Sequence, residues 1–336
     1  MNQYVCARVT RMDDVDIALF DYDRYNTLYY FLMNADEQIY MRYGGRGPMS
    51  PISYLDLSSL EAALEQGLEL HQQYQKGELA KAGRPQPLFP RDIPAVFEGT
   101  TQKGRCVECH LIGDLQNVQR QRDGKLDRLA HMYRSPDIKT IGIDLDIPKG
   151  LVIAEARGAA QAAGMKPGDR ITHLNAARVW TFGDLQYQYD QVSRDAKQIR
   201  ITVERKDDSV DLPITLPDYW WWTDLTYRQL SVEPRIYFKS RPLGKAEKRR
   251  HGLAPRGFAS QVTSVEGFAD ILKLHQLKPG DIVFGVDGVE RDDIANTAEL
   301  FIKLHKNAGD TFMLDLLRDG KRTKMEVKTT SVAYRK

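Results

Sequence analysis

The chain has 336 residues, and its 48 Lys and Arg against 46 Asp and Glu give a formal net charge of +2. Apolar residues make up 42% and charged residues 28%, which is the balance of a folded globular protein. The near-neutral charge provides no general attraction to nucleic acid or to an anionic membrane surface. No apolar run is long enough for an integral membrane segment. The length predicts several domains.

The first quarter of the chain has the pattern of strands followed by a helix. The run 4–9 predicts a buried strand that contains Cys6, and the alternating runs 27–34 and 37–45 predict a hairpin with its turn at Asn34. Asp56 then precedes apolar residues at helical spacing, which predicts a capped helix. This order resembles the C-terminal half of a thioredoxin-like domain. The redox Cys-x-x-Cys of that family is absent here, so we transfer no thiol–disulfide activity to this region.

A cysteine motif follows a proline-rich connector. Cys106, Cys109 and His110 form Cys-x-x-Cys-His, the attachment pattern of c-type haem. Two thiols at this spacing reach both vinyl groups of one porphyrin, and His110 is the expected proximal iron ligand. His131 or Met132, in the helix-prone run that follows, is the expected distal ligand. The expected cofactor is therefore haem c, used for electron transfer or redox sensing with a redox partner protein.

Other uses of the same cysteines stay open. As a dithiol–disulfide couple, Cys106 and Cys109 would make the chain a redox enzyme. As a disulfide, they would be purely structural. A zinc site would need further ligands, for which His110 and His131 are the nearest candidates.

The remainder of the chain contains a duplication. The turn at 165–171 returns at 277–283, both times with Lys-Pro-Gly-Asp between a strand-like run and a second strand. The long period indicates two duplicated domains rather than a solenoid. The second copy is predicted to end in a hairpin that turns at Asp319-Gly320. The aromatic run 219–222 is predicted to pack the connector against the first copy.

The two copies resemble PDZ domains of the bacterial envelope-protease type. This resemblance implies that extended peptides bind by strand addition, while a loop of main-chain N–H groups holds the terminal carboxylate. Pro255 is expected on the docking strand of the second copy, where it donates no N–H, so we expect the first copy to be the better receptor. The expected loop residues are Thr140, Ile141, Gly142 and Ile143 in the first copy and His251, Gly252 and Leu253 in the second.

These patterns together predict an α+β multidomain protein with a partial thioredoxin-like domain and two PDZ-like, β-rich domains. No catalytic residue is assigned, and because Gly-x-Ser-x-Gly is absent we expect no hydrolase. The expected ranges are 1–80 for the thioredoxin-like half, 81–136 for the connector with the cysteine motif, 137–217 for the first PDZ-like domain, 218–248 for an aromatic and basic linker, and 249–332 for the second PDZ-like domain.

The expected function is the binding of protein C-termini or extended peptides, combined with a covalently attached haem. The alternatives are a thiol–disulfide redox protein and a purely structural adaptor. The combination resembles bacterial envelope proteins of the planctomycete type. Haem attachment takes place outside the cytoplasm, whereas no signal peptide stands at Met1. We therefore expect an N-terminally incomplete chain in the periplasm or cell envelope, with a cytoplasmic location as the alternative.

Overall fold

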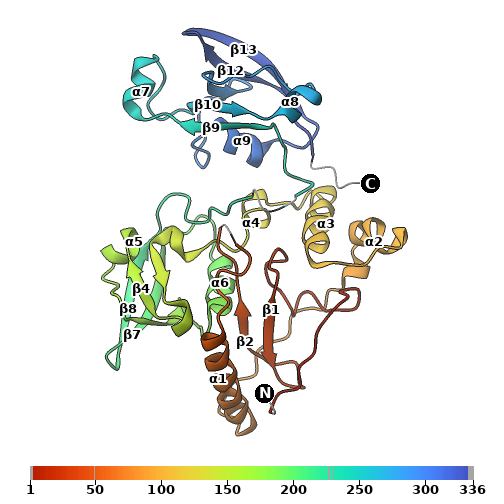
Figure 1. Cartoon of the computed structure of the whole chain (residues 1–336), viewed down its shortest axis with the longest axis vertical. Coiled ribbons are helices and arrows are strands. Elements are labelled where there is room, and N and C mark those ends of the chain that lie inside the picture. The colour runs from red at the N-terminus through yellow and green to blue at the C-terminus, as the bar shows by residue number, and fades with distance from the viewer. Residues whose placement is uncertain (1–2, 49, 226–227, 229, 332–336) are drawn as a thin grey trace. The chain divides into compact units, whose positions relative to one another are not determined.

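The computed structural model describes residues 3–48, 50–225, 228 and 230–331. It is a mixed helix-and-sheet structure whose strands form several antiparallel sheets. The chain divides into two compact units, one of residues 1–119 with 129–228 and the other of residues 120–128 with 229–336 (Figure 1). Among the described residues, no helix has the length and apolar character needed to cross a membrane.

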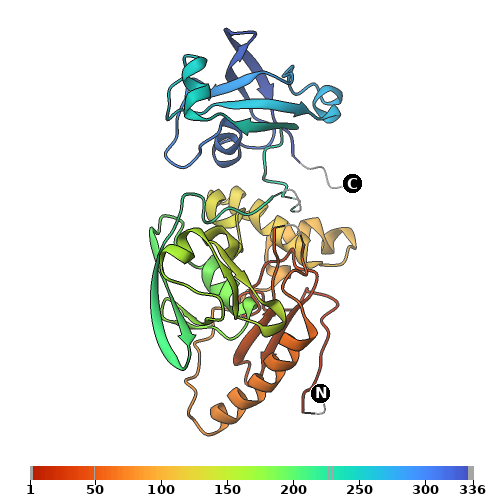
Figure 2. The ribbon, with the colours of Figure 1, turned by 60° about the vertical axis from the view of Figure 1, so that its left-hand side comes forward.

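The predicted hairpin and its helix are confirmed in unit 1. β1 (Tyr29–Met33) pairs antiparallel with β2 (Ile39–Gly44), and the Asn34 side chain accepts two main-chain N–H bonds of 3.0 Å in the turn. α1 (Leu57–Gln75) begins after Asp56, whose carboxylate caps the first turn. The helix packs along the hairpin (Figure 2). Their shared apolar cluster contains Leu32, Met41, Tyr43, Ala63 and Leu70.

The predicted strand at 4–9 is wrong. These residues pair with no neighbouring strand, and Cys6 is exposed rather than buried. A β-branched run becomes a strand only where a partner completes its hydrogen bonds, and none of the described segments does so here. Without this strand, the thioredoxin-like order stays a prediction.

The connector is mostly irregular, as its prolines predict, and short helices interrupt it. Two α-helices follow the connector. The first, α3, starts within the cysteine motif, and the second, α4, is a single turn in the run that was predicted to be helical. The elements are η1 (Pro90–Asp92), α2 (Pro94–Gly99), η2 (Thr101–Lys103), α3 (Cys109–Arg122) and α4 (Arg128–His131).

The first repeat lies in unit 1 and is built on two small antiparallel sheets. β3 pairs with β4, and the second sheet has the order β6-β5-β7-β8. Trp220 from the aromatic run is buried, and its ring lies 5.0 Å from that of Tyr189, which confirms the predicted packing on this repeat. The elements are η3 (Ile138–Ile141), β3 (Ile143–Leu145), η4 (Ile147–Lys149), β4 (Ile153–Ala156), α5 (Gly158–Ala162), β5 (Arg170–Leu174), β6 (Ala177–Arg178), α6 (Phe182–Asp190), β7 (Gln198–Arg205) and β8 (Asp208–Thr215).

The second repeat lies in unit 2 around one sheet of order β13-β12-β11-β10-β9. The predicted hairpin at Asp319-Gly320 is confirmed as β12 and β13. Residues 238–242 fall in the predicted linker, yet they form the edge strand of this sheet. The elements are β9 (Phe238–Pro242), α7 (Lys245–Arg250), β10 (Ser260–Val265), α8 (Gly267–Ile271), β11 (Ile282–Val286), α9 (Ala298–His305), β12 (Thr311–Arg318) and β13 (Lys321–Lys328).

The strand register shows which parts of the repeats correspond. Ile143 faces Ala156 in the β3–β4 pair, as Phe238 faces Val265 in the β9–β10 pair, and each pair has an irregularity shortly afterwards. The residue before each first strand has a positive φ, and its carbonyl accepts an N–H from the residue that follows the second strand. β9 is therefore the counterpart of β3.

The Lys-Pro-Gly-Asp turn is held in the same way in both repeats. The Asp169 carboxylate accepts the amide three residues before it at 2.8 Å and binds Arg205 at 2.7 Å, and Asp281 does the same with Arg318. Burial raises the pKa of both aspartates, but the hydrogen bonds from the arginines and amides outweigh it and leave each pKa below its ordinary value. The aspartate thus ties the turn to the following hairpin.

Candidate functional site

The cysteine motif lies at the start of α3, with its two thiols in different surroundings. Cys106 is exposed, whereas Cys109 is half-buried against an apolar cluster, and its Sγ accepts a hydrogen bond from the Tyr22 hydroxyl at 3.0 Å. Burial raises the pKa of Tyr22 to about 12, so this phenol remains a donor at neutral pH. The His110 side chain is 54% exposed, and its Nε2 lies 3.1 Å from the Glu108 carboxylate.

The surroundings of these residues bear on the predicted haem attachment without testing it. Two thioether bonds require both thiols to reach one porphyrin edge, but the Cys109 thiol is engaged with Tyr22. Met132, an expected distal ligand, is 1% exposed, and His131 is its neighbour on α4. Haem attachment therefore stays a prediction of the motif. Among the described residues, no three His, Cys, Asp or Glu side chains gather as ligands for the alternative zinc ion.

We expect Cys109 to react with iodoacetamide about tenfold more slowly than Cys106 and Cys6 in the native chain, because its thiol is half-buried and hydrogen-bonded. Peptide mass spectrometry over a time course measures the three rates separately. Tyr22→Phe should reduce the difference in rate between Cys109 and the two exposed cysteines, because it removes the hydrogen bond to the Cys109 thiol. The urea-unfolded chain, in which all three thiols should react at the same rate, is the control. Equal native rates would contradict this placement of Cys109.

The face of α6 that borders the loop before β3 is covered by the N-terminal part of unit 1. Phe182, Gln186 and Tyr189 follow one another along this face and are 6%, 3% and 0% exposed. The Tyr54 ring stacks on the Phe182 ring, with centroids 3.3 Å apart and planes at 12°. The Tyr54 hydroxyl donates to the Asp137 carboxylate at 2.7 Å, and Asp137 lies shortly before the loop 140–143. No side chain of this face is open to solvent.

Main-chain contacts hold the same segment against the helix. The Gln186 side chain accepts from the Arg46 amide at 3.2 Å and donates to the Arg46 carbonyl at 2.9 Å, as a neighbouring strand would. A Cβ on Gly45, whose φ is +131°, would lie 2.5 Å from the Phe182 ring, and one on Gly183 would lie 2.4 Å from the Arg42 carbonyl oxygen. Residues 44–48 and 50–54 are hereafter the capping segment.

Residues 140–143, the predicted loop of the first repeat, lie immediately before and at the start of β3. Its amides are partly used within the loop, because the Gly142 N–H donates to the Lys139 carbonyl at 3.0 Å. The Thr140 hydroxyl donates to the Asp137 carbonyl at 2.7 Å. Ile141 and Ile143 are buried. With the capping segment against α6, this repeat presents a closed groove.

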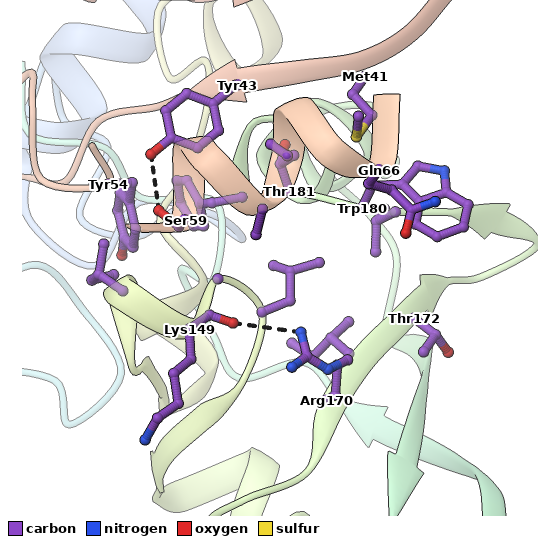
Figure 3. Close-up of a pocket in the computed structure, with 18 of the residues that line it drawn as sticks. Met41, Tyr43, Tyr54, Ser59, Gln66, Lys149, Arg170, Thr172, Trp180 and Thr181 are labelled. Carbon is purple, nitrogen blue, oxygen red and sulfur yellow. Dashed lines mark hydrogen bonds between the residues drawn. The ribbon is translucent and has the colours of Figure 1, made fainter. Parts of the chain in front are cut away.

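A cavity of about 440 Å³ lies beside the start of α6, where α1 closes over the first repeat (Figure 3). Ser59 and Gln66 of α1 form one wall, and Trp180 lies beside them. The Ser59 hydroxyl is bonded to Tyr43 at 2.9 Å. Arg170 contributes to the opposite wall. The walls mix apolar side chains such as Met41 and Leu151 with polar ones such as Ser59 and Thr172, and the cavity lies between α1 and the repeat.

In the second repeat the structure corrects the predicted place of the loop. Because Phe238 corresponds to Ile143, the loop before the docking strand is 235–237. Tyr237 takes the place of Gly142 and keeps a positive φ of 54°, so the sequence has no glycine there to reveal the loop. His251, Gly252 and Leu253 instead follow α7, beyond the opposite end of β9, and Pro255 lies in a turn rather than on a strand.

β9, the strand of the second repeat that corresponds to β3, has a free edge. Among the described strands, β9 has β10 alone as a neighbour in the sheet, and Lys239 and Arg241 are exposed. The Tyr237 carbonyl accepts from Glu266 at 2.9 Å, on the β10 side. Since antiparallel pairing alternates, the main-chain groups of Phe238 and Ser240 point away from β10.

The loop before β9 also contains main-chain N–H groups that can donate hydrogen bonds to a ligand. Within the described part of the chain, the structure records no acceptor for the amides of Ile236 and Tyr237. In the first repeat, by contrast, the amide at the equivalent of Tyr237 is bonded inside the loop. Unpaired N–H groups next to a free strand edge are the arrangement that receives a carboxylate at the end of an added strand.

No family model matches the chain. Solved structures with some similarity include the HtrA-type protease AlgW with a tripeptide, at 14% identity over 30% of this chain and 32% of that one, with a TM-score of 0.24. The same protease with a decapeptide matches at 11% identity over 43% of this chain and 53% of that one, with a TM-score of 0.24. The chain thus spans about a third to a half of those proteins.

Proposed function

We propose that this chain binds the free C-termini of other polypeptides, and that its second repeat is the receptor. Both repeats would have the PDZ type of fold, and the ligand would add as an antiparallel strand to the edge of β9. The observation that supports this proposal is the free strand edge at Phe238 and Ser240, which lies beside the unpaired amides of Ile236 and Tyr237. Main-chain bonds would supply affinity, and the amides would select a terminal carboxylate.

In this proposal the first repeat is a structural domain. The capping segment covers the helix face that a peptide would contact, and Gln186 already pairs with the main chain of Arg46. Because the capping segment continues directly from β2, its packing against α6 also holds the β1–β2 hairpin on the first repeat. The preference between the two repeats is therefore the reverse of the sequence prediction.

The remaining sequence predictions are kept as proposals outside this function. An envelope location and a covalent haem with a redox partner depend on the cysteine motif, and a partial thioredoxin-like domain depends on the hairpin order. The dithiol alternative would place Cys106 and Cys109 in a redox couple, although both thiols are free in this structure. Peptide binding by β9 requires none of these properties.

Peptide arrays with free C-termini, probed with the full chain, should yield a bound sequence, and its C-terminal amide should bind at least about tenfold more weakly. Ser240→Pro should abolish binding, because it removes an N–H that faces the ligand. Ser240→Ala is the matched control: it loses the hydroxyl bond to Glu299 but retains the N–H and should bind normally. Fluorescence anisotropy gives the affinities, and thermal unfolding shows whether both variants fold.

A peptide methylated on the nitrogens that face β9 tests the same bonds without altering the protein, and it should not bind. Equal affinities of acid and amide, or full binding by a folded Ser240→Pro chain, would reject β9 as the receptor.

A further inference from the structure

The segment from β9 to the turn after α7 is strongly basic. Between residues 239 and 256 it holds seven Lys and Arg and a single Glu, in a chain whose net charge is only +2. The corresponding stretch of the first repeat, which follows Ile143, contains Asp144, Asp146 and Lys149. The basic character therefore belongs to the second repeat alone and is not a consequence of the shared fold.

Among the described residues, most of these cations have no carboxylate partner. The one carboxylate, that of Glu247, accepts the Gly244 amide at 2.8 Å and pairs with Arg241 at 2.9 Å, so it caps α7. Lys248 is half-buried and donates to the Gly257 carbonyl at 2.7 Å. The other five cations are exposed, and within the described ranges they form no ion pair. They are Lys239 on β9, Lys245, Arg249 and Arg250 on α7, and Arg256 in the turn that follows.

The direction of strand addition brings a ligand to these cations. A peptide that lies antiparallel to β9 and ends at Ile236 and Tyr237 must run upstream toward Pro242. α7 begins at Lys245, just beyond that end of the strand (Figure 1). β9 has five residues, so the last five or so residues of the ligand would lie along it, and the residues before them would pass α7.

We propose that the second repeat selects C-terminal segments that carry Asp or Glu just upstream of their last five or so residues. This inference rests on the proposed function, since it takes the ligand's path from strand addition to β9. The terminal residues give the main-chain bonds, while the upstream carboxylates interact with the cations of α7. Attraction of this kind raises the association rate and weakens as salt screens it.

The test uses the full chain and three peptides that share one array-selected C-terminal sequence and differ only upstream, where they carry Asp, Ser or Lys residues. The Asp peptide should bind about tenfold more tightly than the Ser peptide at low salt and about twofold more tightly at high salt. The Lys peptide should be the weakest. Fluorescence anisotropy gives the affinities.

Charge reversal locates the effect. Arg249→Glu with Arg250→Glu should remove the advantage of the Asp peptide while leaving the affinity for the Ser peptide unchanged, which also shows that the variant is folded. Lys321→Glu with Lys328→Glu makes the same change in charge on β13, at the opposite edge of the sheet, and should preserve the advantage.

The possible failures are distinct. If none of the three peptides binds, the proposed function fails and this inference fails with it. If the Ser and Asp peptides bind equally well at low salt, or if the β13 variant loses as much of the advantage as the α7 variant, selection by α7 is rejected while C-terminal binding stands.

Discussion

Asp23→Ala is expected to lower the free energy of unfolding of unit 1 by about 3–5 kcal/mol. Arg228 donates two hydrogen bonds to the Asp23 carboxylate, of 3.0 and 2.5 Å, and the two side chains are only 3% and 2% exposed. The substitution leaves a buried guanidinium without the carboxylate that neutralises it. Urea denaturation followed by tryptophan fluorescence reports on unit 1 alone, because all four tryptophans, Trp180 and those at 220–222, lie in it.

An exposed ion pair provides the matched control. Asp14 pairs with Arg91, and their side chains are 75% and 53% exposed, so Asp14→Ala should change the free energy of unfolding by less than about 1 kcal/mol. If Asp23→Ala proved no more destabilising than Asp14→Ala, the buried pair would not hold unit 1 together as described.

Tyr54→Ala is expected to destabilise unit 1 by about 3–5 kcal/mol, because it removes a buried aromatic side chain from the centre of the capped groove. Tyr54 is 4% exposed, stacks on Phe182 and donates to Asp137. Burial raises the pKa of Asp137, so the lost hydrogen bond also leaves a poorly solvated carboxyl group. The same urea titration measures the effect.

Tyr54→Phe separates the two contributions. It keeps the ring on Phe182 and removes only the hydroxyl, so it should cost about 1–3 kcal/mol. A Tyr54→Ala chain that unfolds within about 1 kcal/mol of the unaltered chain would show that the capping segment is not packed on α6.

Local patterns predicted the local elements. Three signals act over only a few residues: the alternation around Asn34, the Asp56 cap and the Asp319-Gly320 turn. The elements that they predicted, the β1–β2 hairpin, α1 and the β12–β13 hairpin, are all present. The strand at 4–9 failed because a strand depends on a partner that its own residues do not specify. The Lys-Pro-Gly-Asp turns revealed the duplication because Asp169 and Asp281 perform the same local bonding.

The site was harder to predict because it depends on contacts between distant segments. Nothing near Gln186 indicates that Arg46 pairs with it. Gly45 lies against the Phe182 ring and Gly183 against the Arg42 carbonyl, but a glycine in the sequence does not identify the neighbour that it approaches. The loop of the second repeat was misplaced because Tyr237 adopts a positive φ that sequence patterns assign to glycine. Only the register of β9 with β10 identifies it.

Amide hydrogen exchange of the full chain, with and without an array-selected peptide that has a free C-terminus, tests the central claim most directly. The account predicts that the peptide slows exchange at Ile236, Tyr237, Phe238 and Ser240 and leaves the amides of 140–145 unchanged. Slowed exchange at 140–145 without any change along β9 would contradict it, since the ligand would then occupy the repeat that the capping segment closes.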